Sequence, residues 1–421
     1  MLKKIIFNTL FILLLTSFND VFSQSKISSP YSRYGLGEIS FNKYTRNTSI
    51  GSIGGGFRNS RYVNHFNPAS YTSSDSMWVV FENTINSNYE KLSNWKKEEY
   101  SNNIALSSLL IQYPITKWWA GSFGLLPYSK VGYNISETNS INDSTSFNNL
   151  YTGNGGLNTF YLGNAFKIKK CLSIGFNASI LFGNINRSTD ISSSLSDENY
   201  GAHYDIDYTI SSIFFKYGLQ YENKLNNNYK YSLGVSFTNS DEIKYKRSFI
   251  AYTYNSLSNK DTIDDYSNSN LKIKLPLHVI FGAVLTKNDK WFAGVDYQYL
   301  GFSDYEFIAD ETSNYKNNNI IAFGAQTLPN LNANKYINKI SYGIGFRYSD
   351  GYLKFKNTNI TEYAFTFGLG LPIKRSNSII NLGFELGQRG TEKNALLKEK
   401  FVALNITFAF AERWFYKKKF D

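Results

Sequence analysis

The last fifth of the chain has the clearest pattern of hydrophobic and polar positions, because large apolar residues occupy every second position of four successive segments. In one of them, Tyr363 and Phe365 alternate with Ala364 and Thr366. Successive side chains of a β-strand point to opposite faces of the sheet. Each segment therefore predicts a strand with one bulky apolar face and one small polar face. The four segments are 337–349, 361–373, 378–390 and 400–411.

The two faces differ in a way that favours a membrane protein. The apolar face is rich in aromatic residues, and the other face is mostly Gly, Ala, Ser, Asn and Thr. In a soluble β-sandwich, which is the alternative, the apolar face would meet a second sheet in a shared core. A lipid-facing apolar surface around a crowded polar lumen is typical of outer-membrane barrels. We therefore predict an all-β fold, a transmembrane antiparallel β-barrel in the bacterial outer membrane.

The alternation extends through most of the chain and predicts about fourteen strands. An even number of strands places both ends of the chain on the same side of the membrane. Short turns are then expected in the periplasm and long loops outside. The polar stretches 188–203 and 255–269 are predicted to be two of these long outer loops. Besides the four above, the predicted strands are 76–91, 101–115, 118–134, 145–168, 171–187, 204–225, 228–254, 270–287, 290–305 and 317–327.

Tryptophan positions provide an independent check on this topology. Indole rings prefer the boundary between hydrocarbon and headgroups. Only Trp95 falls in a predicted outer loop. The other five lie at predicted periplasmic strand ends: Trp78, Trp118, Trp119, Trp291 and Trp414.

The N-terminal region divides into two parts. Residues 1–23 have the pattern of a secretory signal peptide, with Lys3 and Lys4 before an apolar run and Ser23 at the cleavage site. Residues 24–74 are rich in Gly, Ser, Asn and Arg without alternation, and we predict that they form a plug inside the lumen. A periplasmic extension is the alternative. The barrel is expected over 75–411, followed by a basic periplasmic tail over 412–421.

The composition limits the classes of binding partner that we expect. The formal net charge is +11, which often indicates nucleic-acid binding. Here Lys and Arg are scattered through turns and loops, and the predicted signal peptide argues against nucleic acid. Attraction to anionic lipid headgroups is a milder explanation. The chain has one cysteine, so no intrachain disulfide can form, and it has no later apolar run long enough for a transmembrane helix.

Catalytic and metal-binding patterns are not found in the sequence. The histidines are His65, His203 and His278, and none adjoins a nucleophile motif. No His/Cys/carboxylate cluster with metal-ligand spacing occurs. We expect no enzyme activity, no metal and no cofactor.

The tripeptide Asn67-Pro68-Ala69 ends the Gly-rich N-terminal region and precedes the fourteen predicted strands. This layout resembles the FadL family of outer-membrane transporters for long-chain fatty acids and other hydrophobic molecules. The stretches 363–372, 382–390 and 413–419 look like the Bacteroidetes branch of that family. The basic tail after the last strand departs from the family pattern and leaves room for a periplasmic or protein partner.

The resemblance implies a route through the protein. In the family, substrate enters the lumen from the outer loops and leaves sideways where one strand kinks beside the plug. Proline has no N–H for the strand ladder, and Pro127 lies in the third predicted strand. We hypothesise that Pro127 opens a lateral gate facing Asn67, Pro68 and Ala69; a bulge without an opening is the alternative. Pro276 is a second candidate for such a break.

Several charged or polar residues fall on the predicted lumen face. They are expected either to form buried pairs that hold the plug or to meet the carboxylate of a fatty acid. The candidates are Lys272, Lys274, His278, Arg347 and Glu385.

Two functions follow. The first is passive uptake of a hydrophobic small molecule with lateral release into the outer-membrane lipid, and the family resemblance places it ahead. The second is a non-transporting barrel subunit of a larger outer-membrane complex for secretion or outer-membrane protein assembly, in contact with other outer-membrane or periplasmic proteins. A transporter requires a continuous apolar tunnel, whereas a subunit would have a blocked lumen and an apolar or aromatic patch for protein contact. The polar outer loops weaken the first function.

Overall fold

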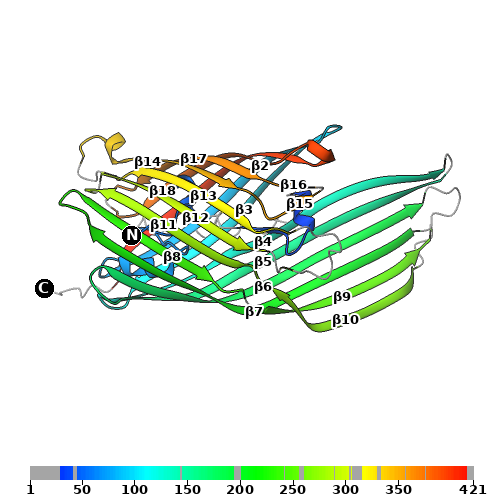
Figure 1. Cartoon of the computed structure of the whole chain (residues 1–421), viewed down its shortest axis with the longest axis horizontal. Helices are drawn as coiled ribbons and strands as arrows, with labels where there is room; N and C mark the ends of the chain where they lie inside the picture. The colour runs from blue at the N-terminus through cyan, green and yellow to red at the C-terminus, as the bar shows by residue number, and fades with distance from the viewer. Residues whose placement is uncertain are drawn as a thin grey trace, which may run out of the picture.

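The computed structural model describes residues 29–40, 45–142, 145–193, 201–240, 242–255, 260–288, 290–302, 305, 315–329, 333–355, 357–374 and 376–414. These residues form a closed antiparallel β-barrel (Figure 1). The predicted signal peptide and residues 415–421 of the predicted tail lie outside the described residues.

The barrel wall consists of sixteen long strands that occupy fourteen places. β8 and β9 are two parts of one wall strand, and β10 and β11 are two parts of the next one. β11 pairs with β8, and β10 pairs with β9, in one continuous register. The barrel closes where β19 pairs with β2, from Lys398 opposite Ser93 to Arg413 opposite Trp78. The strands are β2 (Trp78–Ser93), β3 (Glu98–Pro114), β4 (Trp119–Asn142), β5 (Thr145–Lys167), β6 (Leu172–Ser193), β7 (Gly201–Lys224), β8 (Tyr229–Thr238), β9 (Glu242–Tyr254), β10 (Lys260–Lys274), β11 (Leu277–Lys287), β12 (Trp291–Gly301), β13 (Asn318–Thr327), β14 (Ser341–Ser349), β17 (Glu362–Pro372), β18 (Ile379–Gly390) and β19 (Lys398–Arg413).

Short elements complete the fold. No helix among the described residues is both long enough and apolar enough to span a membrane. The short strands are β1 (Glu38–Ile39), β15 (Lys354–Phe355) and β16 (Thr358–Asn359), and the 3-10 helices are η2 (Pro30–Arg33), η3 (Arg46–Ile50), η4 (Pro68–Ser73), η5 (Tyr336–Lys339) and η6 (Lys393–Ala395).

The predicted two faces of the wall are confirmed. Along β17 buried and exposed residues alternate, with Ala364 and Thr366 buried and Phe365 and Phe367 about half exposed. Cross-strand partners keep the same phase, since Phe365 lies opposite Phe346 on β14. Bulky apolar side chains therefore cover the outside of the barrel, where hydrocarbon can solvate them.

The tryptophan positions also agree with the predicted topology. Trp78, Trp119 and Trp291 begin strands at the end of the barrel that has the short turns. Trp118 lies in one of those turns and Trp414 follows β19, whereas Trp95 lies in the β2–β3 hairpin at the other end. This distribution is in keeping with the predicted topology, in which the short turns lie in the periplasm and the opposite rim faces outside.

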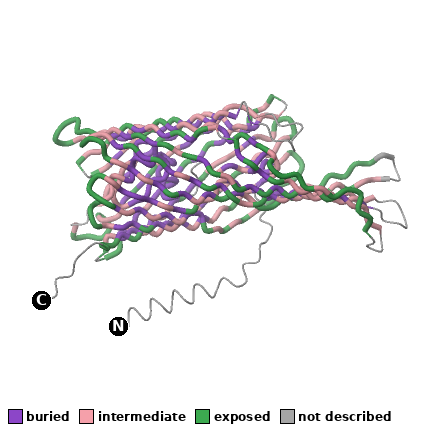
Figure 2. The backbone as a smooth tube through the Cα atoms, turned by 90° about the horizontal axis from the view of Figure 1, so that it is seen from below, coloured by how far each residue is buried: buried purple, intermediate pink, exposed green. Residues whose placement is uncertain are grey.

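Two predicted outer loops are instead strands. β6 continues to Ser193, β7 begins at Gly201 and β10 begins at Lys260, so most of 188–203 and 255–269 is strand. β4 and β7 have 24 residues each, whereas about 9–11 suffice to span a membrane. The outer halves of β4 to β7, with β9 and β10, rise from the rim as one projecting sheet (Figures 1 and 2). Polar Asn- and Ser-rich sequence hid these strands, because continuous backbone pairing rather than an apolar pattern maintains them.

The predicted strands 228–254 and 270–287 are each interrupted. Pro276 lies at the second interruption, between β10 and β11, where its missing N–H ends the ladder. The interruption shifts the phase of the side chains. Ile273 and Leu275 are buried, which places Lys272 and Lys274 on the outward face. Their predicted lumen position is therefore wrong, whereas His278, beyond the break, faces the lumen as predicted.

Residues 29–40 and 45–74 lie inside the barrel, and we call them the plug segment. Its apolar side chains are buried among lumen-facing wall residues, as in the cluster that joins Ile50, Ile53 and Phe57 to Val284 and Phe292. The plug segment contains short 3-10 helices and turns. Most of its backbone hydrogen bonds are therefore made locally or with the wall.

Candidate functional site

The tripeptide Asn67-Pro68-Ala69 starts the 3-10 helix η4 at the inner face of β6 to β8. The Asn67 side chain accepts a hydrogen bond from the Ala69 N–H at 3.1 Å and Pro68 occupies the first helical position, the usual arrangement of an N-terminal cap. The Asn67 amide donates to the carbonyls of Leu219 and Val235 on the wall, at 3.1 and 3.2 Å. These three residues therefore anchor the plug to β7 and β8 and do not line the cavity beside Pro127.

Glycines allow the plug backbone to lie directly on the wall. A Cβ at Gly234 would lie 2.0 Å from the carbonyl oxygen of Gly55, and a Cβ at Gly282 would lie 2.4 Å from the nitrogen of Gly56. On the opposite side, a Cβ at Gly345 would lie 2.2 Å from a plug nitrogen. Such contacts leave no space for a solute between plug and wall at these places.

Buried polar side chains attach the plug at further points. Asp296 on β12 accepts hydrogen bonds from the N–H groups of Gly54 and Gly55, at 2.6 and 2.8 Å. Arg389 on β18 forms an ion pair with Glu38 of the plug at 2.6 Å. Arg46 of the plug donates to Gln326 on β13, and its guanidinium lies 4.0 Å from the Tyr62 ring centroid. Burial lowers the pKa of Arg46.

Arg347 and Glu385 are lumen residues, as predicted, and both are buried. The Arg347 guanidinium pairs with Glu362 and Glu385 and donates to Ser52 of the plug at 3.0 Å. Buried charges are stable only when they are paired in this way. Arg347 therefore helps to hold the plug, and its guanidinium is already paired with the carboxylates of Glu362 and Glu385.

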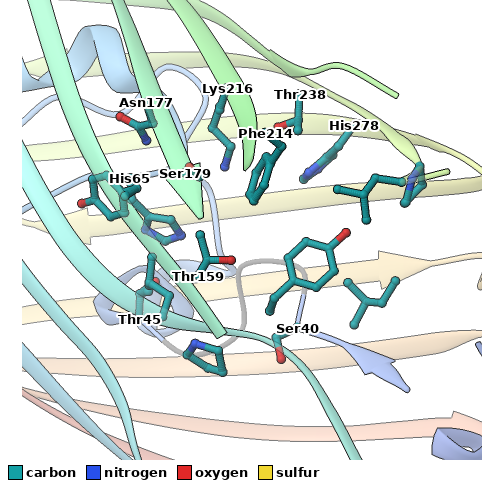
Figure 3. A pocket seen from close by; sticks show the side chains of 17 residues that line it. Ser40, Thr45, His65, Thr159, Asn177, Ser179, Phe214, Lys216, Thr238 and His278 are labelled. Carbon is teal, nitrogen blue, oxygen red and sulfur yellow. The ribbon is translucent and has the colours of Figure 1, made fainter. Parts of the chain in front are cut away.

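A cavity in the lumen lies beside Pro127 (Figure 3). It has a volume of about 110 Å³, and two further cavities measure about 50 and 30 Å³. Typical ligand pockets hold about 300–1,000 Å³. The cavity is bounded by Pro127 and Pro276, the two prolines singled out in the sequence, and by Tyr128 and Phe214.

Three side chains of basic residue types line this cavity: His65 of the plug, Lys216 of β7 and His278 of β11 (Figure 3). Burial, and then the nearby Lys216, lower the pKa of His65 well below its usual value, so this imidazole is neutral at pH 7. Its Nδ1 is buried and has no hydrogen-bond partner among the described residues. None of the described residues lining the cavity is Asp or Glu, so Lys216 contributes a positive charge without a carboxylate on the same wall.

The wall beside Pro127 is incompletely paired. β3 and β4 pair from Pro114 opposite Ala120 to Leu109 opposite Leu125, and no described residue of β3 before Leu109 registers with β4. The pairing of β4 with β5 also shifts by one residue at Pro127. A break in the ladder thus begins two residues before this proline, next to the cavity.

The outer part of the lumen is closed by an apolar cluster. Leu36 and Ile39 of the plug pack against inward-facing residues of β4 to β7, β9, β10, β12 and β13, and Leu157, Leu181 and Leu300 are almost fully buried. This close packing separates the cavity near Pro127 from the outer rim.

Sequence reasoning missed Lys216 and Arg389. Lys216 lies in phase with Phe214 and Gly218 on the inward face of β7, so the alternation carried the signal. Arg389 follows the last predicted inward residue of its strand, and only the fold brings it to Glu38 of the plug. No group of three or more His, Cys, Asp or Glu side chains suited to a metal ion occurs among the described residues.

His203 lies on β7 in the projecting sheet, where a loop was predicted. Its Nδ1 is 3.1 Å from Asp190, and its Nε2 is 3.3 Å from the Ser188 hydroxyl and 3.1 Å from Asp205. A general base must keep Nε2 available for the nucleophile's proton. Here Asp205 competes for that nitrogen, so the arrangement is a polar cluster that joins β6 and β7.

These features define a class of protein: a transmembrane β-barrel whose lumen holds an N-terminal plug. The chain belongs to the BamG family, whose model matches residues 1–421. No curated protein matches the sequence.

Solved structures with a similar fold are FadL-family barrels. The CymD monoaromatic hydrocarbon channel matches with a TM-score of 0.59 and 12% identity, over 91% of this chain and 100% of that one. The P. putida toluene transporter TodX matches with a TM-score of 0.57 and 14% identity, over 88% and 99%. A Pseudomonas aeruginosa FadL homologue gives 0.58 and 11%, over 88% and 98%. The chain therefore has the FadL-type outer-membrane barrel fold, as its sequence indicated.

Proposed function

We propose that this protein is a non-transporting barrel subunit of a larger outer-membrane protein complex. The observation that carries the proposal is the closed lumen. Plug backbone lies on wall backbone on two sides, and an apolar cluster fills the outer part. The cavities of about 110, 50 and 30 Å³ fall short of the continuous apolar tunnel that transport would need.

Two further features support this proposal. The projecting sheet offers a large protein surface above the outer rim, which a channel for small molecules does not require (Figure 1). The family designation BamG is in keeping with a role in outer-membrane protein assembly, one of the two machineries considered from the sequence.

Mild detergent extraction of the tagged full-length protein from its native membranes tests the proposal. We expect other outer-membrane or periplasmic proteins to co-purify in fixed stoichiometry, while an abundant unrelated barrel from the same membranes is left behind. Depletion of the protein should then lower the amounts of other outer-membrane barrels if the complex assembles them, or of secreted proteins if it exports them. Recovery of the barrel alone, with lipid as its only companion, would reject the proposal.

A second candidate function is passage of a hydrophobic small molecule. The unpaired stretch of wall beside Pro127 and the adjoining cavity with Lys216 favour it, since an amine there can pair with the carboxylate of a fatty acid. The test is uptake of a labelled long-chain fatty acid by cells with and without the protein. Lys216→Met should lower uptake about tenfold if one charge-assisted contact is lost, whereas Lys272→Met, on the outward face, should not. Equal uptake in cells lacking the protein excludes this function.

A further inference from the structure

The projecting sheet ends in the edge strand β10, which has a residue-by-residue register with β9 alone among the described strands. β10 pairs with β9 from Lys260 opposite Tyr254 to Lys274 opposite Glu242, and no other described strand has a residue register with it. β12, the next strand around the barrel, ends at Gly301 opposite Leu277. It therefore stops short of Lys274, the residue of β10 nearest the rim. Twelve of the fifteen β10 residues are exposed, so the row of backbone N–H and C=O groups along this edge is accessible.

Free strand edges invite pairing with another backbone. The groups along such an edge alternate between donors and acceptors at the spacing of a β-ladder, which a second strand matches and a lipid or sugar does not. The occupant that fits this edge is therefore an extended polypeptide segment.

The charges on β10 argue against a second copy of this chain. Asp261, Asp264 and Asp265 lie in the outer half of the strand, and Lys272 and Lys274 lie near the rim. Two copies in one membrane share the same orientation, so their β10 edges could pair only in parallel. Parallel pairing would bring the three aspartates of one copy beside those of the other, and like charges opposite each other destabilise a sheet.

The inner face of the sheet next to this edge is aromatic. The Tyr266 ring of β10 lies 5.1 Å from Phe249 of β9, which stacks with Tyr204 of β7 at 6.4 Å. The Arg247 guanidinium lies 5.9 Å from the Phe249 ring and 6.0 Å from the Tyr266 ring. All four side chains are only partly buried. A strand added beside β10 would place alternate side chains against Tyr266, which favours apolar or aromatic residues there.

We propose that the free edge of β10 binds an extended segment of a partner protein as an added strand. That segment carries basic residues opposite Asp261, Asp264 and Asp265 and an apolar or aromatic residue beside Tyr266. The inference rests on the proposed function as a complex subunit and names the surface and the chemistry of the contact.

Photo-crosslinking in native membranes tests it with the full-length protein. A benzophenone amino acid replaces Asp265 on the β10 edge, and Asp207, exposed on β7 but paired with β6 and β9 on both sides, is the matched control position. We expect a crosslink from position 265 to a protein that co-purifies with the barrel, mapping to a segment that contains Lys or Arg, and none from position 207. A crosslink to a second copy of this chain, or to lipid alone, would overturn the inference.

Charge reversal provides the second readout. Asp264→Lys with Asp265→Lys should lower recovery of the crosslinked partner about tenfold after a wash at moderate salt, because basic residues would then face basic residues. The control, Glu99→Lys with Glu137→Lys, changes the net charge equally and should leave recovery unchanged. Unaltered heat-modifiable migration on gels verifies that both variants fold. If the complex purifies normally and the β10 variants behave like the control, the edge inference fails while the proposed function stands.

Discussion

At the scale of single residues, a few buried side chains determine whether the plug stays attached to the wall. Asp296 is fully buried and satisfies two plug N–H groups at once. His65 is buried and neutral, with Nδ1 unpaired among the described residues. Each of these groups makes the stability of the plug depend on one chemical property: the acceptor oxygens of a carboxylate in the first case, and the charge state of an imidazole in the second.

Asp296→Asn should destabilise the protein by about 1–3 kcal/mol. One carboxylate oxygen accepts both plug N–H groups, and a neutral amide oxygen in its place makes weaker hydrogen bonds than a charged one. Equilibrium unfolding in detergent measures the change, and faster proteolysis within residues 45–74 would locate it in the plug. Asp207→Asn, at an exposed position on β7, is the control. Equal effects of the two substitutions would contradict the assigned role of Asp296.

The His65 imidazole should make stability fall as the pH falls. Its pKa is lowered in the folded state, so below about pH 6.5 the unfolded chain binds a proton that the folded chain does not. The stability contribution is thus complete above that pH and is lost below it, by up to about 1.4 kcal/mol per pH unit. Unfolding curves from pH 8 to pH 5 for the natural chain and for His65→Asn should converge toward low pH. Curves that stay parallel would show that His65 does not titrate on unfolding.

At the scale of elements, proline and strand length decide where the wall is continuous. Pro127 and Pro276 flank the same cavity although they lie on β4 and between β10 and β11. Beside Pro127 the ladder between β3 and β4 ends, whereas the ladders β4–β5 and β5–β6 continue into the projecting sheet. The wall is therefore weakest between β3 and β4, over residues 98–108 of β3.

Hydrogen exchange should reveal this weak stretch. Pairing on both sides slows amide exchange, so residues 98–108 of β3, which register with β2 but not with β4, should exchange faster than the rest of the strand. Residues 109–114 of the same strand, paired on both sides, and residues 157–165 of β5 should be protected and serve as internal references. Uniform protection along all of β3 would mean that the wall is closed beside Pro127.

At the scale of the whole molecule, the barrel and the plug form one unit with a closed lumen. Contacts with the plug come from strands all around the wall, including β7, β8, β11, β12, β13, β14 and β18. A β-barrel of this size would enclose an aqueous pore if its interior were empty. The plug therefore closes what would otherwise be an aqueous pore.

Planar-bilayer recordings test this separation. The natural chain should give no stable ionic conductance, because plug backbone lies directly on the wall and an apolar cluster fills the outer part of the lumen. A variant that lacks residues 29–74 but keeps the signal peptide should conduct steadily once inserted. The variant with Lys216→Met, which leaves the plug in place, should remain silent. Steady conductance of the natural chain would contradict a closed lumen.

The sequence alone predicted the barrel, its fourteen places and the two faces of its wall, because a two-residue period is a local property that backbone geometry translates directly into sheet faces. It also placed Arg347, Glu385 and His278 in the lumen, since their phase within a strand is readable from their neighbours. It marked Pro127 and Pro276 as breaks, because proline lacks the N–H that a strand ladder needs whatever strand lies beside it.

Only the tertiary structure decided what these residues face. The break at Pro276 moved Lys272 and Lys274 to the outside, because the phase of a strand cannot be read across an interruption. Much of the polar stretches taken for loops is strand, because backbone pairing with the adjacent strands holds them without an apolar pattern. Asn67 binds β7 and β8 rather than lying beside Pro127, and Lys216 lines the same cavity as His65. The plug sequence has no periodicity, so it does not indicate which part of the wall each residue contacts. Contacts of that kind arise only when the barrel closes around the plug.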